Sequence, residues 1–148
     1  MLQAAGSTEN GTSGRHDAVA GGCLRIVIFG AGAIGSLFGA LMSRANEVTL
    51  VCREEHRKAI LENGLRVTGR TELLARPNVA GSAGECPTPD ILFITVKSYD
   101  TKAVVDEVKD LVGDDTVVVS LQNGLGNLEA ISENMKGAKI IGCVTSHG

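Results

Sequence analysis

A glycine-rich turn between an apolar run and a helical pattern is the feature that most constrains this chain. Residues 25–29 read Arg-Ile-Val-Ile-Phe, residues 30–35 read Gly-Ala-Gly-Ala-Ile-Gly, and helical spacing continues to residue 45. The pattern G-x-G-x-x-G between a strand and a helix is typical of dinucleotide-binding turns. The chain holds 19 glycines, so such a pattern can also arise by chance. A further strand predicted at residues 47–51 favours the dinucleotide interpretation.

Each glycine of this turn has a predicted role. Gly30 permits a tight bend, and Gly32, which has no Cβ, lets the backbone approach a pyrophosphate closely. Gly35 and Gly39 lie one helical turn apart and let the helix pack closely on the strand. The first N–H groups of the helix would face the phosphates. The alternative is a turn whose glycines serve packing alone. The residues expected to bind the pyrophosphate are Gly30, Ala31, Gly32, Ala33, Ile34 and Gly35.

Length and composition narrow the class of protein. A chain of 148 residues, 43% of them hydrophobic, is sufficient for one domain with its own core. No apolar run approaches the roughly 20 residues of a membrane-spanning helix, and the net charge of −3 gives no basic surface for nucleic acid. The four cysteines are scattered, so neither a zinc site nor a disulfide framework is indicated. We expect a cytoplasmic protein without a metal, a membrane partner or a nucleic-acid partner.

The chain divides into a tail and one domain. Residues 1–22 are rich in small polar residues and lack the charged start and apolar centre of a signal peptide. We predict a flexible tail at residues 1–22 and a single domain at residues 23–148.

Alternating strand and helix patterns predict an α/β domain of the Rossmann type, with a doubly wound, mostly parallel sheet. Between the second strand and the central one, short extended segments indicate an irregular insert with edge strands. In such a sheet the loops behind the strands share one edge, where ligands bind. The expected helices are residues 54–63, 101–112 and 128–135. The expected later strands and strand pieces are residues 65–67, 72–74, 78–80, 91–96, 116–119 and 139–144.

The end of the second strand predicts the cofactor. An NAD site places Asp or Glu there to hold the ribose hydroxyls, whereas this strand is followed by Arg53. A guanidinium can bind a 2′-phosphate through two hydrogen bonds. Glu54 and Glu55 could also reach a ribose, but the first turn of the next helix suits acidic residues. The sequence therefore predicts NADP, and the alternative is an ordinary solvated arginine near a helix start.

Polar residues directly follow the later strands. Lys97 could meet a phosphate, a ribose or a substrate carboxylate, or it could be a solvated lysine at a strand end. Asn123 carries an amide that could orient a nicotinamide carboxamide or a substrate carbonyl, although Asn-Gly is also a preferred turn. We count Lys97, Gln122 and Asn123 as cofactor-binding residues, and Lys97 and Asn123 as substrate-binding residues as well.

Five motifs in order resemble the N-terminal NADP-binding domain of the ketopantoate reductase (2-dehydropantoate 2-reductase) family. They are residues 30–36, Arg53, and residues 95–98, 121–126 and 144–148, and the resemblance covers residues 24–148. It implies NADPH-dependent reduction of 2-dehydropantoate, a 2-oxo acid, in pantothenate and coenzyme A biosynthesis. It also implies that residues 30–35 hold the pyrophosphate, that Arg53 binds the 2′-phosphate, and that Lys97 and Asn123 lie along the nicotinamide and substrate.

The resemblance implies that the proton donor lies outside this chain. Reduction of a carbonyl needs an acid for the developing alkoxide, and the family supplies a lysine from a second, all-helical domain. This chain ends before that domain, so we expect no catalytic residue within it. We expect a C-terminal domain or a second chain to complete the site. We also expect a homo-oligomer, because the cleft edge that such a domain would cover leaves an apolar patch. His147 lies near the cleft as an alternative acid, although its position in the resembling motif only lines the site.

Two other functions remain open. One is a module that senses a dinucleotide without turnover, and the other is a different NAD(P)-dependent dehydrogenase of the 2-hydroxyacid type. A sensor has no need of Lys97 and Asn123 beside the nicotinamide, which favours an enzyme.

Overall fold

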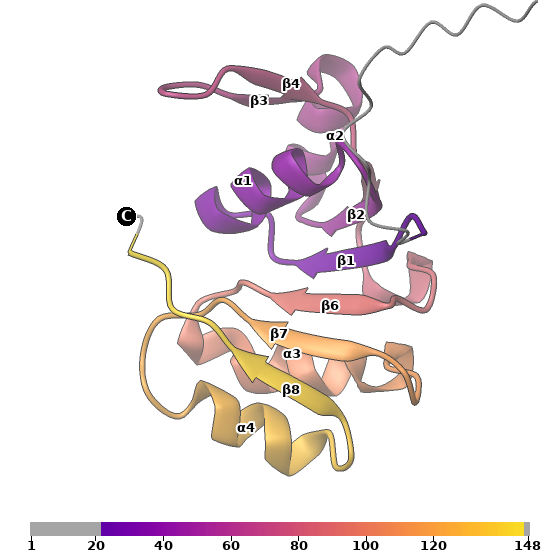
Figure 1. The fold of residues 1–148 in the computed structure, drawn as a ribbon, viewed down its shortest axis with the longest axis vertical. Helices are drawn as coiled ribbons and strands as arrows, with labels where there is room; N and C mark the ends of the chain where they lie inside the picture. The colour runs from indigo at the N-terminus through magenta and orange to yellow at the C-terminus, as the bar shows by residue number, and fades with distance from the viewer. Residues whose placement is uncertain (1–21, 147–148) are drawn as a thin grey trace, which may run out of the picture.

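A six-stranded sheet forms the centre of the molecule, in a computed structural model that describes residues 22–146. The predicted tail, apart from Gly22, and His147 lie outside this range. The strand order is β5-β2-β1-β6-β7-β8, and all neighbouring pairs are parallel. The order reverses between β1 and β6, which confirms the doubly wound, Rossmann-type sheet (Figure 1). The strands are β1 (Arg25–Phe29), β2 (Glu47–Val51), β5 (Asn78–Ala80), β6 (Ile91–Ile94), β7 (Val117–Ser120) and β8 (Lys139–Gly142).

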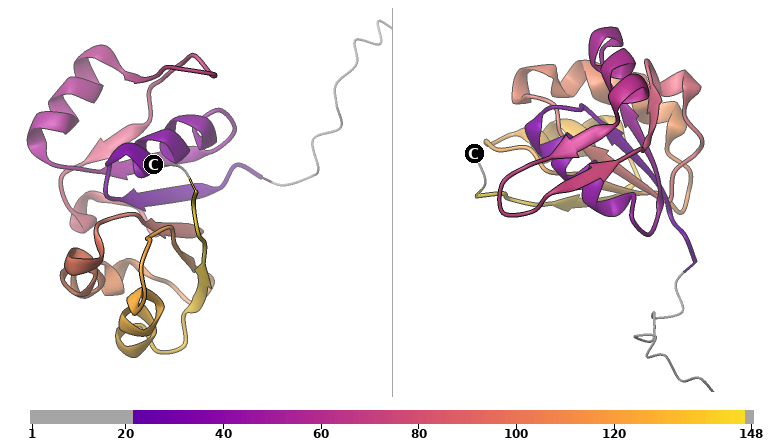
Figure 2. Two further views of the ribbon diagram at one scale, coloured as in Figure 1. Left: turned by 90° about the vertical axis from the view of Figure 1, so that its left-hand side faces the viewer. Right: turned by 90° about the horizontal axis from the view of Figure 1, so that it is seen from above.

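Helices cover both faces of this sheet, because alternate residues of the buried strands point to opposite sides. Ile26 and Ile28 of β1 join a buried cluster with Ala40 of α1, whereas Val27 joins a second cluster with Val105 of α3. Figure 2 shows α1 and α3 on opposite sides of the sheet. The helices are α1 (Ala33–Met42), α2 (Glu54–Asn63), α3 (Thr101–Val108) and α4 (Asn127–Asn134).

The helices of the described residues are short. The longest, α1 and α2, have 10 residues each. None of the helices within residues 22–146 is both long and apolar enough to cross a membrane.

The segment between α2 and β6 is the predicted insert. β3 (Leu65–Val67) and β4 (Leu73–Ala75) form a separate antiparallel hairpin, and β5 adds a parallel edge strand beside β2. The hairpin contributes Leu65 and Ala75 to the cluster on the α1 side. The insert therefore extends the sheet and closes its α1 face.

Most element boundaries that differ from expectation do so by one or two residues, but α3 ends at Val108 instead of residue 112, and a 3₁₀ turn at Lys109–Leu111 follows it. β6 ends at Ile94 instead of residue 96, and β7 begins at Val117 instead of residue 116. Thr116 is held in a turn, because its hydroxyl donates to the carbonyl of Pro89 at 2.7 Å and accepts from the N–H of Gly113 at 3.0 Å. These bonds fix the turn before β7.

An ion pair joins the starts of β1 and β6. The Asp90 carboxylate accepts hydrogen bonds from the backbone N–H of Arg25 at 2.7 Å and from its guanidinium at 3.1 Å. These bonds hold the pKa of Asp90 below its usual value.

Because this pKa is lowered in the folded state, the stabilising contribution is present above the usual Asp pKa of about 3.9 and is lost as the pH falls through the folded value. Asp90→Asn should therefore lower the melting temperature at pH 7, with a difference that shrinks in acid. Thermal unfolding of the unaltered protein and of Asp90→Asn, from pH 7 into acid, measures this difference in melting temperature. A difference that is constant with pH would contradict the stabilising role of the Asp90 carboxylate.

Candidate functional site

A cleft of about 570 Å³ lies at the edge of the sheet where the strands end. The left view in Figure 2 shows the loops at these carboxyl ends facing the reader. The glycine turn, the start of α2, the loop behind β6 and one side of α3 form its walls. The lining residues are Phe29, Gly30, Ala31, Gly32, Val51, Cys52, Arg53, His56, Gly81, Thr95, Val96, Lys97, Tyr99, Asp100, Ala103, Val104 and Glu107.

Two glycines of the turn are required by the protein itself. Gly30 has a φ of +107°, and a Cβ there would lie 2.8 Å from Cγ1 of Val96. A Cβ on Gly35 would collide with the carbonyl oxygen of Gly30. Thr95 closes the turn by donating its hydroxyl to the carbonyl oxygens of Phe29 and Gly30. The predicted packing role of Gly35 is thus confirmed, with the turn itself as its neighbour.

Gly32 differs from these two glycines. Its φ of −73° and ψ of −168° suit any amino acid, and a Cβ built on it meets nothing within 4 Å. Neither backbone conformation nor internal packing therefore explains a glycine here. The space beside it opens into the cleft, where a ligand could approach the backbone closely.

The N-terminus of α1 faces this space with its positive end uncompensated. The first helical bond runs from the N–H of Ser36 to the carbonyl of Gly32 at 2.8 Å, so the preceding N–H groups of the helix have no acceptor within it. No acidic residue lies in the first turn, and Gly32 offers no side-chain cap. The turn can therefore bind an anionic group through its backbone.

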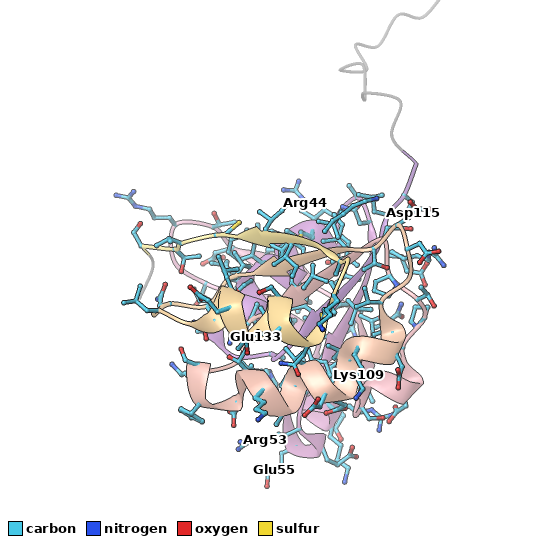
Figure 3. All side chains as sticks on the ribbon, turned by 90° about the horizontal axis from the view of Figure 1, so that it is seen from below. Arg44, Arg53, Glu55, Lys109, Asp115 and Glu133 are labelled. Atoms are coloured by element: carbon cyan, nitrogen blue, oxygen red, sulfur yellow. The ribbon has the colours of Figure 1, made fainter. Side chains whose placement is uncertain are left out.

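Arg53 directly precedes α2 and lines the same cleft as the glycine turn. Its side chain is exposed, and within residues 22–146 it makes no ion pair. Figure 3 shows Arg53 at the lower edge of the molecule beside Glu55, far from Arg44. Glu54 lies next in sequence, but its carboxylate contacts Arg57 at 3.3 Å and Lys58 at 3.7 Å. Arg53 is thus the cation presented to the cleft at the end of β2.

The remaining predicted residues separate into two groups. Lys97 is exposed and lines the cleft, together with Gly30, Ala31, Gly32 and Arg53. The others lie outside the lining: Ala33, Ile34, Gly35, Gln122 and Asn123.

Gln122 and Asn123 take different positions in the loop behind β7. Gln122 is 8% exposed, and its amide donates to the carbonyl of Val96 at 2.9 Å and to the hydroxyl of Thr101 at 2.7 Å. Asn123 is exposed, and its backbone carbonyl accepts from the hydroxyl of Ser98 at 2.9 Å. The loop carrying Asn123 is therefore fastened to the loop carrying Lys97.

Sequence reasoning missed several lining residues. His56 lies in the first turn of α2, Glu107 lies on α3, and Tyr99 follows Lys97 with 83% of its surface exposed. Tyr99 is the only tyrosine of the chain, and its place behind a buried parallel strand was a usable signal. Cys52 also lines the cleft, and burial raises the pKa of its thiol. Within residues 22–146, no three His, Cys, Asp or Glu side chains gather as a metal site would require.

Comparison with known proteins gives a consistent result. Residues 26–148 match the family model described as Ketopantoate reductase PanE/ApbA. A curated 2-dehydropantoate 2-reductase from Pyrococcus horikoshii is 43% identical over 126 residues, which are 84% of this chain and 40% of that relative. The chain thus spans about 40% of the length of the curated relatives it matches.

Solved structures share the fold. The crystal structure of 2-dehydropantoate 2-reductase from Geobacter metallireducens GS-15 has a TM-score of 0.74 and 32% identity, covering 80% of this chain and 40% of that one. The ternary structure of D-mandelate dehydrogenase with NADH and anilino(oxo)acetate has a TM-score of 0.69 and 30% identity, covering 78% and 38%.

Proposed function

The chain belongs to the ketopantoate reductase family PanE/ApbA, and we propose that it forms the NADPH-binding part of an enzyme that reduces 2-dehydropantoate to pantoate in pantothenate and coenzyme A biosynthesis. The relatives named 2-dehydropantoate 2-reductase are oxidoreductases that use a nicotinamide dinucleotide. The observation that carries the proposal is the cleft beside Gly32, where a glycine without a structural need opens onto the N-terminus of α1.

The proposed roles follow the walls of the cleft. The pyrophosphate lies against the turn formed by residues 30–35, where the free N–H groups of α1 donate to it. Arg53 binds the 2′-phosphate, which makes NADP the preferred cofactor. Bound NADPH would supply the hydride for the reduction. Lys97 and Asn123 orient the nicotinamide half and the 2-oxo acid, and Gln122 supports them from within the protein.

The proton donor and the partners are also part of this proposal. Among residues 22–146, Lys97 is the only lysine that lines the cleft, and we assign it to binding. We place the acid that protonates the alkoxide on a further domain or on a second chain, because the family that this chain resembles supplies it from a second, helical domain. A cytoplasmic location is supported by the four free cysteines.

A second candidate function has its own support. D-mandelate dehydrogenase is a 2-hydroxyacid dehydrogenase solved with NADH, and its fold matches this chain at 30% identity. Under this alternative the chain would bind NADH and serve a different 2-oxo acid. Arg53 argues for NADP instead, because no carboxylate stands at its position.

The chain contains one tyrosine and no tryptophan, which gives the proposal a simple test. Tyr99 lines the cleft, so binding of NADPH should quench its emission to a saturating level. Tyr99→Phe should remove this signal while the fluorescence of NADPH itself still reports binding. A titration that changes neither signal would contradict the dinucleotide site.

The substrate is tested with a protein that also carries the further domain or chain. Consumption of NADPH by that protein on addition of 2-dehydropantoate, followed by absorbance, would support the proposed activity, whereas this chain alone should bind NADPH without consuming it at a comparable rate. Consumption of NADH with an aromatic 2-oxo acid would favour the second candidate.

A further inference from the structure

A buried group of polar side chains links the loops behind β6 and β7, and we call it the Thr101 network. Its members are Thr101, Ser120, Gln122 and Asn127, which are between 2% and 8% exposed, with the exposed Ser98 at its outer end. Gln122 donates its amide to the hydroxyl of Thr101 at 2.7 Å and accepts from Ser120 at 3.1 Å. Thr101 in turn donates to Oδ1 of Asn127 at 3.1 Å.

The outer end of the network reaches the surface at Asn123. The amide of Asn127 lies 3.3 Å from the hydroxyl of Ser98 and from the carbonyl oxygens of Asn123 and Gly124. Ser98 donates to the same Asn123 carbonyl at 2.9 Å. The loops behind β6 and β7 are therefore joined both inside the protein and at its surface.

These bonds bracket two of the proposed binding residues. Val96 and Ser98, on either side of Lys97, are both bonded to the network. Asn123 is held because the amide of Asn127 donates to its backbone carbonyl and to that of its neighbour Gly124. The side chains of Lys97 and Asn123 nevertheless remain exposed. The network fixes their backbones and leaves both side chains available to a ligand.

The network is satisfied in its donors and acceptors. Both N–H groups of the Gln122 amide have acceptors, and the hydroxyl of Thr101 accepts one bond and donates another. In a buried site such bonds are strengthened by the low dielectric, and losing one partner leaves the other group unpaired. Removing one hydroxyl should therefore disturb the loops at both ends.

We propose that the Thr101 network is a positioning device that holds Lys97 and Asn123 at a fixed separation for the nicotinamide half of the cofactor. The inference rests on the proposed function. Thr101 and Asn127 act through the two loops and need not touch the cofactor. A loop that is held before binding loses less freedom on binding, which raises affinity. The adenosine half, bound by Arg53 and the glycine turn, should be independent of the network.

Two ligands distinguish the nicotinamide half of the proposed site from its adenosine half. NADPH occupies both halves, whereas adenosine 2′,5′-bisphosphate carries the 2′-phosphate and adenine without the nicotinamide. Thr101→Val keeps the shape of the side chain and removes its hydroxyl. This change should weaken the affinity for NADPH about tenfold and change the affinity for the bisphosphate by less than about twofold. Thr101→Ser should restore NADPH binding, because it returns the hydroxyl.

Thr116→Val is the matched control. Thr116 is also 2% exposed and also donates and accepts one hydrogen bond, but it lies before β7 at the opposite edge of the sheet. It should lower the melting temperature and leave both ligand affinities unchanged. Ser98→Ala is a second variant for the network. Because Ser98 is exposed, this change should preserve folding and weaken NADPH severalfold.

Two results would overturn the inference. One is wild-type NADPH affinity in both Thr101→Val and Ser98→Ala. The other is an equal loss of affinity for both ligands in Thr101→Val, since an equal loss indicates that Thr101 has a general structural role. Failure of the proposed function gives a different result, because the unaltered chain would then bind neither NADPH nor the bisphosphate. That result would also overturn the inference.

Discussion

Gly32→Val should abolish cofactor binding while the protein remains folded. A Cβ at this position meets no protein atom within 4 Å, and the backbone there is extended with a negative φ. The fold can therefore accept a branched side chain, and the free energy of unfolding should fall by no more than about 1 kcal/mol, because valine is a poorer N-cap residue than glycine. The same side chain would occupy the space where we propose the pyrophosphate lies.

The expected loss is large because several interactions fail together. Hydrogen bonds to a charged group contribute about 1.5–3 kcal/mol each. Losing two of them weakens binding by roughly 100-fold or more. NADPH fluorescence measures the affinity, and thermal unfolding measures the stability. A Gly32→Val protein that is folded and binds NADPH normally would show that the pyrophosphate lies elsewhere.

Two other glycines complete this experiment. Gly84 also has open space beside it, but it lies outside the cleft lining, so Gly84→Val should leave binding intact. Gly35→Ala should destabilise the protein, because its Cβ would collide with the Gly30 carbonyl. The three variants together separate a glycine that serves the ligand from one that serves packing.

The sequence predicted the elements of the fold because their signals are local. The apolar runs of β1 and β6 and the glycine turn between β1 and α1 each stand out within a few residues. Because connections between parallel strands are right-handed, helices can cover both faces of the sheet only if the strand order reverses. The turn before β7 was misplaced by one residue, because the hydrogen bond from Thr116 to Pro89 spans distant parts of the sequence.

The site was less predictable because it depends on side-chain direction. Arg53 and Lys97 lie in the segments that follow β2 and β6, and both line the cleft as expected. Gln122 also follows a strand, but its side chain turns inward to Thr101, and no local pattern specifies that direction. Glu107 lines the cleft from α3, where only the packing of the helix decides which residues face the ligand.

The choice of cofactor should depend on Arg53. Its guanidinium is exposed, and within residues 22–146 it makes no ion pair that a phosphate would have to break. Arg57, one turn further along α2, is not equivalent, because its guanidinium contacts Glu54 at 3.3 Å and Glu85 at 3.6 Å. Glu54 is engaged by the same contacts, so it is poorly placed to hold a ribose. We therefore expect Arg53 to determine the discrimination between NADPH and NADH.

Arg53→Asp should reverse this preference. The change removes charge-assisted bonds to the 2′-phosphate, worth about 1.5–3 kcal/mol, and adds a carboxylate that repels the phosphate and can hold the ribose hydroxyls of NADH. The ratio of NADPH to NADH affinity should fall by roughly 100-fold. Arg44→Asp makes the same charge change at the opposite side of the molecule (Figure 3) and should leave the ratio unaltered. An unchanged ratio in Arg53→Asp, or an equal fall in both variants, would mean that Arg53 does not contact the phosphate and would leave the NADH-dependent alternative as the better assignment.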